Sequence, residues 1–534
     1  MKNWLKYYFK KGNPSSSAEW RTKDSIFAFL GESLDTDGKL KELASDLPDE
    51  NREDENKLRY APGLMDAMFG AAKSDDSSKI IDELTNIITK IAKYGDKNAE
   101  SDFYQLVISN ESVIGILDEF LERIVKKGLP AQPHLINFSK DMALRTNNRN
   151  SVKFGIAIAG LCQDKSVINE LKVLGLHDEF TVYAVVALSN LSNNLVDDLF
   201  DLARKVDGWG KIQLVDRWAK MDLSDEQRDW LLCKGYQNFI MYQYLAFTCA
   251  VNGRLHEKLE ENNITSEYFK SAGEILDALI EENGPSEDIS DYIYASSVVE
   301  NYLRHAKTHA ADIADLVTLH RIKDFLIGLQ GASEKPQGNG WTEDIISNCI
   351  IDVIAILDGR DWKELTYEAL KSSDHKTYWN GKTAAEKLGI DLWEVVWERL
   401  QLNPMDATAW YDVTHYATPE KAEEVIDFAL RNIPLNELST GPKDILGLGV
   451  EYVKYQPLDY VITFLEGYPR KGEPIISAGL NSSVTRNRNM AIKVLTKWKA
   501  ENWSVELKQQ LERLLGIEPN KDTKLSIQNL LKGE

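Results

Sequence analysis

The sequence predicts an all-α protein, a solenoid of stacked helical hairpins with a period of about thirty residues. Apolar residues recur at a thirty-residue step between Asn150 and Gly253. A fixed period of this length is typical of repeat proteins, in which each unit buries its apolar face against its neighbours. Four series carry the pattern: Val152, Val182, Ile212 and Tyr242; Gly155, Val185, Val215 and Leu245; Ile158, Leu188, Trp218 and Thr248; and Leu161, Leu191, Met221 and Val251.

A second, weaker helix precedes the strong helix of each repeat. Val173, Ala203 and Cys233 fall at the same thirty-residue step on this first helix. Turn-forming residues, such as Gly208, separate the two helices. Two helices in each period make a hairpin that cannot bury its apolar faces alone, so the sequence predicts that neighbouring hairpins stack.

The chain is longer than one compact core allows. Single hydrophobic cores stop growing at roughly 250–300 residues, and this chain has 534. A solenoid escapes that limit because each repeat contacts only its neighbours. We expect an N-terminal helical region with an acidic loop at 1–145, repeats at 146–330, a linker or long loop at 331–341, and C-terminal repeats at 342–534.

Helical spacing predicts further elements on both sides of the repeats. Residues 2–11 have aromatic and basic residues at helical spacing, so they pack on the first repeats or lie on a membrane surface. Residues 58–70 form a turn and a short helix, which either pack or line a pocket. The other expected helices are Ser25–Leu34, Ile80–Tyr94, Ser112–Lys127, Leu135–Arg145, Ser296–Gln330 as one helix or a bent pair, Trp362–Ser372, Lys376–Leu388, Leu392–Leu400, Ala407–Ala417, Glu473–Asn481 and Thr485–Lys497.

Composition narrows the class of protein. The formal charge is −21, with 84 acidic and 63 basic side chains, which argues against general nucleic-acid binding because phosphates require a concentrated basic surface. No continuous apolar run reaches about 18 residues, so no membrane span is expected. The four cysteines are scattered and predict reduced thiols. Lys6 and Lys10 interrupt any signal-peptide core. These features predict a cytoplasmic protein.

Two stretches carry a resemblance to a known repeat class. NSSVTRNRNMAIKVLTKW (481–498) and HDEFTVYAVVALSNLS (177–192) are similar to the second helix of a HEAT repeat. The resemblance implies a HEAT/armadillo-like architecture. It places Ala491, Val494 and Leu495 on the buried face. Arg486 and Arg488 are interpreted as hydrogen-bond donors between repeats.

A second resemblance is more particular. MKNWLKYY, LRYAPGLMDAMFG and GEPIISAGLNSSVTRNRNMA together resemble a family of Gram-positive bacterial proteins often labelled limonene hydroxylase. That label implies a monooxygenase that hydroxylates a monoterpene such as limonene. No motif for the chemistry has a counterpart in this chain, so catalytic residues are unknown.

One cluster of residues has the composition of a metal site. On the helix expected after Ser296, His305, His309 and Asp312 are spaced i, i+4 and i+7, and His320 returns to the same face three turns later. Two histidines and a carboxylate are the ligands of non-haem iron, and zinc also takes them. The alternative is a solvated polar face. No other cofactor is expected, since no dinucleotide, phosphate-loop or haem signature is present.

The sequence therefore leaves two hypotheses open. The first is a cytoplasmic binding or scaffold protein that holds a protein or peptide partner in the concave surface of the solenoid. It requires no cofactor. The second is an iron- or zinc-dependent monooxygenase, which depends on the family label and on His305, His309, Asp312 and His320.

Overall fold

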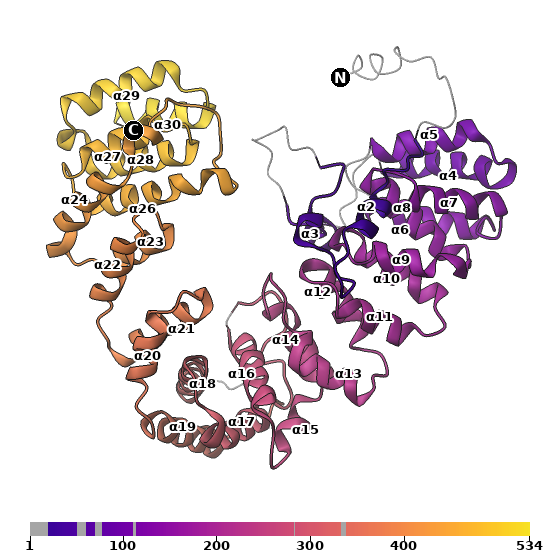
Figure 1. Ribbon diagram of the computed structural model, residues 1–534, viewed down its shortest axis with the longest axis horizontal. Helices are drawn as coiled ribbons and strands as arrows, with labels where there is room; N and C mark the ends of the chain where they lie inside the picture. Colours follow the sequence, from indigo (N-terminus) through magenta and orange to yellow (C-terminus); the bar gives the residue numbers. More distant parts are fainter. Residues whose placement is uncertain are drawn as a thin grey trace. The chain divides into compact units, whose positions relative to one another are not determined.

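The computed structural model describes residues 20–50, 60–69, 77–109, 114–281, 283–332 and 338–533. These residues form helices joined by turns and loops (Figure 1). The two β-bridges among them are isolated, and no strand forms. The all-α prediction is confirmed. The helix expected at residues 2–11 lies outside the described residues. No helix in the described part of the chain is long and apolar enough to cross a membrane.

Contacts divide the chain into two compact units. Of the described residues, those between 20 and 311 and between 318 and 360 make up one unit, and residues 312–317 and 361–533 make up the other. In the stretch expected to be a linker or a long loop, 331–341, the described residues 331–332 and 338–341 belong to the first unit.

The helices of the first unit match most of the expected positions. Ser296–Gln330 is a pair of helices, as one of the two alternatives foresaw. The bounds are α2 (Ile26–Glu32), α3 (Leu64–Phe69), α4 (Ser77–Tyr94), α5 (Lys97–Ile108), α6 (Ile114–Lys126), α7 (Pro133–Leu144), α8 (Arg149–Leu161), α9 (Ile168–Leu174), α10 (Asp178–Leu191), α11 (Leu195–Ala203), α12 (Gly208–Trp218), α13 (Asp225–Trp230), α14 (Gln243–Asn252), α15 (Leu255–Glu260), α16 (Ser266–Ile280), α17 (Ala295–His309), α18 (Ile313–Gly331) and α19 (Glu343–Asp358).

The second helices of successive hairpins pack in chain order. α8 contacts α10, α10 contacts α12, α12 contacts α14, and α14 contacts α16. Most members of the thirty-residue series lie on these helices, although Met221 follows the end of α12 and Tyr242 precedes the start of α14. The series that begins at Gly155 is buried throughout, and so is the one that begins at Ile158. The fourth series is not buried throughout, because its last member, Val251, is exposed. Such contacts are compatible with a thirty-residue hairpin repeat, and the solenoid arrangement stays a prediction.

Close packing between two helices explains why one position in the series, Gly155, is a glycine. α7 and α8 lie so close that a Cβ at Gly155 would stand 2.3 Å from the backbone nitrogen of Ala143. No side chain fits there, although later repeats place Val185, Val215 and Leu245 at this position. The repeat therefore varies in side-chain size where neighbouring backbones approach most closely.

The second unit continues as helical hairpins. Its helices are α20 (Lys363–Leu370), α21 (His375–Leu388), α22 (Trp393–Leu402), α23 (Ala407–Tyr416), α24 (Ala422–Asn432), α25 (Leu435–Leu438), α26 (Gln456–Phe464), α27 (Glu473–Leu480), α28 (Thr485–Trp498), α29 (Val505–Ile517) and α30 (Lys521–Lys532). The second helices again contact one another in order, α23 with α26, α26 with α28, and α28 with α30.

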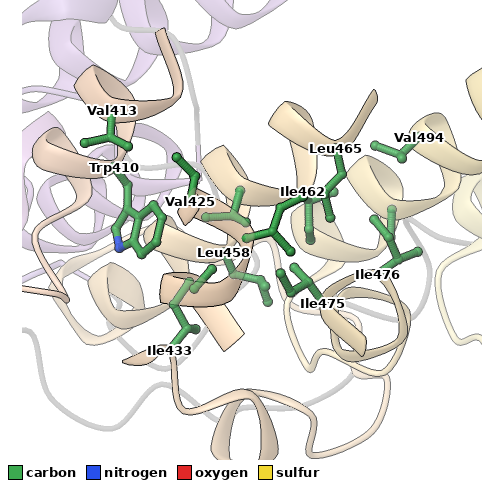
Figure 2. Packing of buried hydrophobic residues seen from close by; sticks show 14 of the residues in the cluster. Trp410, Val413, Val425, Ile433, Leu458, Ile462, Leu465, Ile475, Ile476 and Val494 are labelled. Atoms are coloured by element: carbon green, nitrogen blue, oxygen red, sulfur yellow. The ribbon is translucent and has the colours of Figure 1, made fainter. Parts of the chain in front are cut away.

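One continuous apolar core runs through the second unit (Figure 2). Leu458 and Ile462 of α26 lie at its centre, with Trp410 of α23 on one side and Ile475 and Ile476 of α27 on the other. The expected apolar stripe of α22, made by Trp393, Val396, Trp397 and Leu400, is buried in this core. Its interpretation as core is confirmed.

Candidate functional site

The four residues of the expected metal site lie on two helices instead of one. α17 ends at His309 and α18 begins at Ile313. Asp312 lies between the two helices. Its carboxylate accepts hydrogen bonds from the backbone nitrogens of Ala314 and Asp315 in the first turn of α18. This is the capping contact of a helix start. The expectation that a single helix projects His305, His309 and Asp312 from one side is therefore wrong.

Each histidine has its own surroundings. The Nε2 of His305 lies 3.0 Å from the carbonyl oxygen of Leu259, and burial lowers the pKa of this imidazole. His309 stacks on Phe269, with ring centroids 5.5 Å apart. His320 is buried, and its Nδ1 lies 3.3 Å from the Nζ of Lys323. Among the described residues no group of three or more His, Cys, Asp or Glu side chains has the arrangement to hold a metal ion. Iron or zinc binding stays a prediction, and metal analysis of the purified protein tests it.

The second helices of the second unit carry a row of aromatic side chains. Trp379 of α21, Tyr411 of α23 and Tyr460 of α26 follow one another, with ring centroids 6.4 Å apart for the first pair and 5.7 Å for the second. Trp379 and Tyr411 are exposed to 36% and 40%. We call these three residues the aromatic row. Tyr460 is half-buried. Aromatic rings that are exposed side by side on neighbouring helices are typical of an interaction site.

A buried ion pair lies beneath the aromatic row. The ammonium of Lys382, on α21, donates a hydrogen bond to Asp412 of α23, and neither side chain is exposed by more than 4%. The hydroxyl of Tyr378 donates to the second carboxylate oxygen at 2.7 Å. Lys382 also lies over the rings of Trp379 and Tyr411, 4.0 and 5.6 Å from their centroids. The ammonium of Lys382 therefore lies against one face of each ring, and the imidazole of His415 also stacks on Tyr411, with ring centroids 6.0 Å apart.

Polar contacts continue along the same face. The Tyr416 hydroxyl donates to Glu386, which joins α23 to α21. Asp459 on α26 accepts hydrogen bonds from Arg486 and Asn487 of α28. Burial raises the pKa of Asp459 to about 6, although the charge of Arg486 acts in the opposite direction.

The two arginines singled out from the sequence act between helices. Arg486 contacts Asp459 at 2.8 Å. Arg488 is fully buried and donates two hydrogen bonds of 2.7 Å to Glu518. Arg488 also donates to the carbonyl oxygens of Ser482 and Lys443. Both arginines therefore donate hydrogen bonds to other parts of the second unit, as expected, and the assignment of those parts to separate repeats stays a prediction.

The aromatic row was not predicted from the sequence. The recognisable signal was the 31-residue spacing of Trp379 and Trp410. The structure shows that these two are not equivalent, since Trp410 is fully buried while Trp379 is exposed. The neighbour of Trp379 is Tyr411, one residue further along, which projects from the other side of α23.

Comparisons with known proteins place the chain in no family. No protein-family model matches it. No curated protein shows significant similarity to it. A crystal structure described as that of an engineered protein aligns over 85% of this chain and 98% of its own, at 14% identity and a TM-score of 0.20. A likeness of that size carries no argument about fold or function.

Proposed function

We propose that this chain is a HEAT-like helical-repeat binding protein of the bacterial cytoplasm, whose second unit holds an extended, proline-containing segment of a partner protein. The observation that carries the proposal is the aromatic row, Trp379, Tyr411 and Tyr460. It lies on three successive second helices, the helices that line the ligand face of a stacked-hairpin protein.

The chemistry of the row favours proline over a cation. Aromatic-lined grooves dock proline-rich segments because such segments are already extended and lose little entropy on binding. A cation would also stack on an aromatic face. Here the ammonium of Lys382 already lies against the inner faces of Trp379 and Tyr411. A cationic ligand on the opposite faces of these rings would therefore bind less favourably than it would on rings without a lysine behind them.

The buried pair supports the proposal by making the row rigid. Lys382 and Asp412 join α21 to α23 directly beneath the rings. Trp379 is held further by a hydrogen bond of 2.9 Å between its indole nitrogen and the Nε2 of His375. A partner therefore binds side chains whose conformations are already restricted, which lowers the entropy cost of association.

Selection from a random-peptide display library on the full chain tests the proposal. We expect the enriched peptides to contain proline and to bind the Trp379→Ala and Tyr411→Ala variants at least about tenfold more weakly, a loss of about 1.4 kcal/mol. Tyr367→Ala is the matched control. Tyr367 is an exposed aromatic residue of the same unit, on the first helix α20 and outside the row.

Two results contradict the proposal. One is that no peptide is enriched over selection against the Trp379→Ala protein. The other is that enriched peptides bind wild type and both row variants equally well.

A further inference from the structure

One ring of the aromatic row is held by a histidine of its own helix. The indole nitrogen of Trp379 donates a hydrogen bond of 2.9 Å to the Nε2 of His375, one turn earlier on α21. The centroids of the two rings are 5.8 Å apart. His375 is the first residue of α21 and is exposed. A titratable side chain that solvent reaches is therefore bonded directly to a member of the aromatic row.

The direction of this hydrogen bond defines the charge state of His375. A ring nitrogen that accepts a hydrogen bond carries no proton, so the imidazole is neutral and its proton is on Nδ1. A protonated imidazole has a donor at both nitrogens and no acceptor. Proton uptake by His375 therefore removes the acceptor of the Trp379 indole, whichever way the imidazole is turned. Histidine is the side chain that ordinarily changes its charge between about pH 5 and pH 8.

Two contacts of different kinds hold the Trp379 ring. The ammonium of Lys382 lies 4.0 Å from the ring centroid, and attraction to a ring face leaves the ring free to turn in its own plane. The hydrogen bond to His375 is directional, so it restricts that rotation. Without the acceptor on His375, the indole samples more orientations, and a ligand that stacks on it loses more entropy in ordering it.

Charges of both signs surround His375. Asp374, the preceding residue, caps α21, and its charge interacts with those of His375 and Lys376. Arg399 of α22 donates to the carbonyl oxygen of Ser372, in the turn before α21. The further charged groups are Lys371 at the end of α20, Lys382 behind the Trp379 ring and Asp412 of α23, which pairs with Lys382. A proton on His375 thus places a second positive charge beside a ring that already lies against Lys382.

A second histidine contacts the aromatic row in a different way. The imidazole of His415 on α23 stacks on Tyr411, with ring centroids 6.0 Å apart and an interplanar angle of 8°. The described residues show no hydrogen bond between these two side chains. Protonation of His415 therefore removes no acceptor from the aromatic row, which makes His415 a matched control for His375.

We propose that the hydrogen bond between His375 and Trp379 is a pH-sensitive switch of the aromatic row. With a neutral imidazole, the switch holds the indole in the orientation that the proline-containing segment of the partner meets. With a protonated imidazole, the indole is released and the segment binds more weakly. The effect on binding rests on the proposed function, whereas the switch itself is a property of the chain without a ligand.

Nuclear magnetic resonance of the full chain tests the switch without any ligand. The tryptophan indoles are labelled with nitrogen-15, and the Trp379 resonance is identified by its loss in Trp379→Phe. We expect the indole proton of Trp379 to move upfield between about pH 8 and pH 5, because it loses its hydrogen bond. His375→Gln keeps an acceptor but takes up no proton, so its resonance is expected to stay in place. His415→Gln is expected to titrate as wild type does.

Peptide binding is compared at about pH 7.5 and pH 5.5, on the two sides of the ordinary histidine titration. The probe is a proline-containing peptide selected on the wild-type chain that lacks histidine and acidic residues. We expect wild type and His415→Gln to lose affinity at the lower pH by about threefold or more, the size expected for one hydrogen bond, and His375→Gln to lose none. If selection yields no proline-containing peptide, the proposed function fails, and the Trp379 resonance still decides whether the switch exists.

Four results overturn the proposal. One is a Trp379 indole resonance that does not move with pH in wild type. Another is an equal movement in wild type and His375→Gln. The third is a peptide affinity that falls in acid as much in His375→Gln as in wild type. The last is an equal movement of the indole of Trp410, which is fully buried, because it would show that the whole unit responds to acid.

Discussion

Lys382 and Asp412 stand thirty residues apart in the chain and form a buried ion pair between neighbouring helices. The thirty-residue step of the first unit thus recurs in the second as a physical contact, between corresponding faces of α21 and α23. Asp412 has no exposed surface, and its carboxylate accepts hydrogen bonds from Lys382 and from the hydroxyl of Tyr378. This arrangement makes α21 and α23 sensitive to the loss of either partner.

Lys382→Met is expected to destabilise the second unit by about 3–5 kcal/mol, because it leaves a buried carboxylate without its cation. Hydrogen exchange of the α21 and α23 amides measures the change. The double variant Lys382→Met/Asp412→Leu removes both charges and is expected to recover most of the loss. A double variant as unstable as the single one would show that packing, and not charge, dominates here.

Trp410→Ala and Trp379→Ala are expected to differ sharply. Trp410 is fully buried, and truncating a buried tryptophan costs about 3–5 kcal/mol. Trp379 lies at the surface, so its loss is expected to cost about 1 kcal/mol or less while weakening peptide binding. Urea unfolding followed by circular dichroism compares the two. Equal losses would contradict the assigned register of α21 against α23.

Asp178 is expected to make stability depend on pH. Burial raises the pKa of Asp178 to about 7, and the nearby charge of Asp207 adds to the effect. The folded chain therefore holds a proton that the unfolded chain releases above about pH 4. Stability from this group is present below pH 4 and is lost as the pH rises to 7.

Asp178→Asn removes that dependence on pH, because asparagine has no proton to lose and still accepts hydrogen bonds from the backbone at the start of α12. We expect the variant to be more stable than wild type at pH 8, by about 1 kcal/mol or more, and to match it below pH 4. Urea midpoints measured from pH 4 to 8 supply the comparison. If the urea midpoints of the two proteins changed with pH in the same way, Asp178 would not be the source of the pH dependence.

Arg488→Lys is expected to cost about 2 kcal/mol or more, because lysine keeps the charge but loses the paired hydrogen bonds to Glu518. Arg486→Lys serves as the control. Arg486 contacts its carboxylate through one nitrogen and is 28% exposed, so the same substitution there is expected to cost less. Thermal unfolding of both variants tests the ranking, and a reversed order would contradict it.

The local spacing of apolar residues was sufficient to predict most helices of this chain. The spacing of Trp393, Val396, Trp397 and Leu400 identified a buried face because helical geometry is local. The end of α17 was also marked in the sequence. Asp312 followed by Asp315 is a helix-start signal, and the two residues cap each other's backbone in the structure. Histidine spacing was given more weight than that signal, and the expected single-helix face was wrong as a result.

Contacts between distant parts of the chain are not specified by helical spacing. Asp66 and Lys153 are 87 residues apart, and nothing in either neighbourhood indicates that they meet. Trp379 and Tyr411 come together because of how α21 and α23 are rotated against each other. A change of one residue in that register would have exposed Trp410 instead.

The sequence by itself determined the all-α class, the thirty-residue step and the helices that bear it, because each follows from the periodic burial of apolar side chains along a helix. The tertiary structure alone decided which aromatic rings lie side by side and which carboxylates pair with Lys153 and Arg149 of α8. Both depend on the rotation and approach of neighbouring helices, which the packing of whole side chains sets.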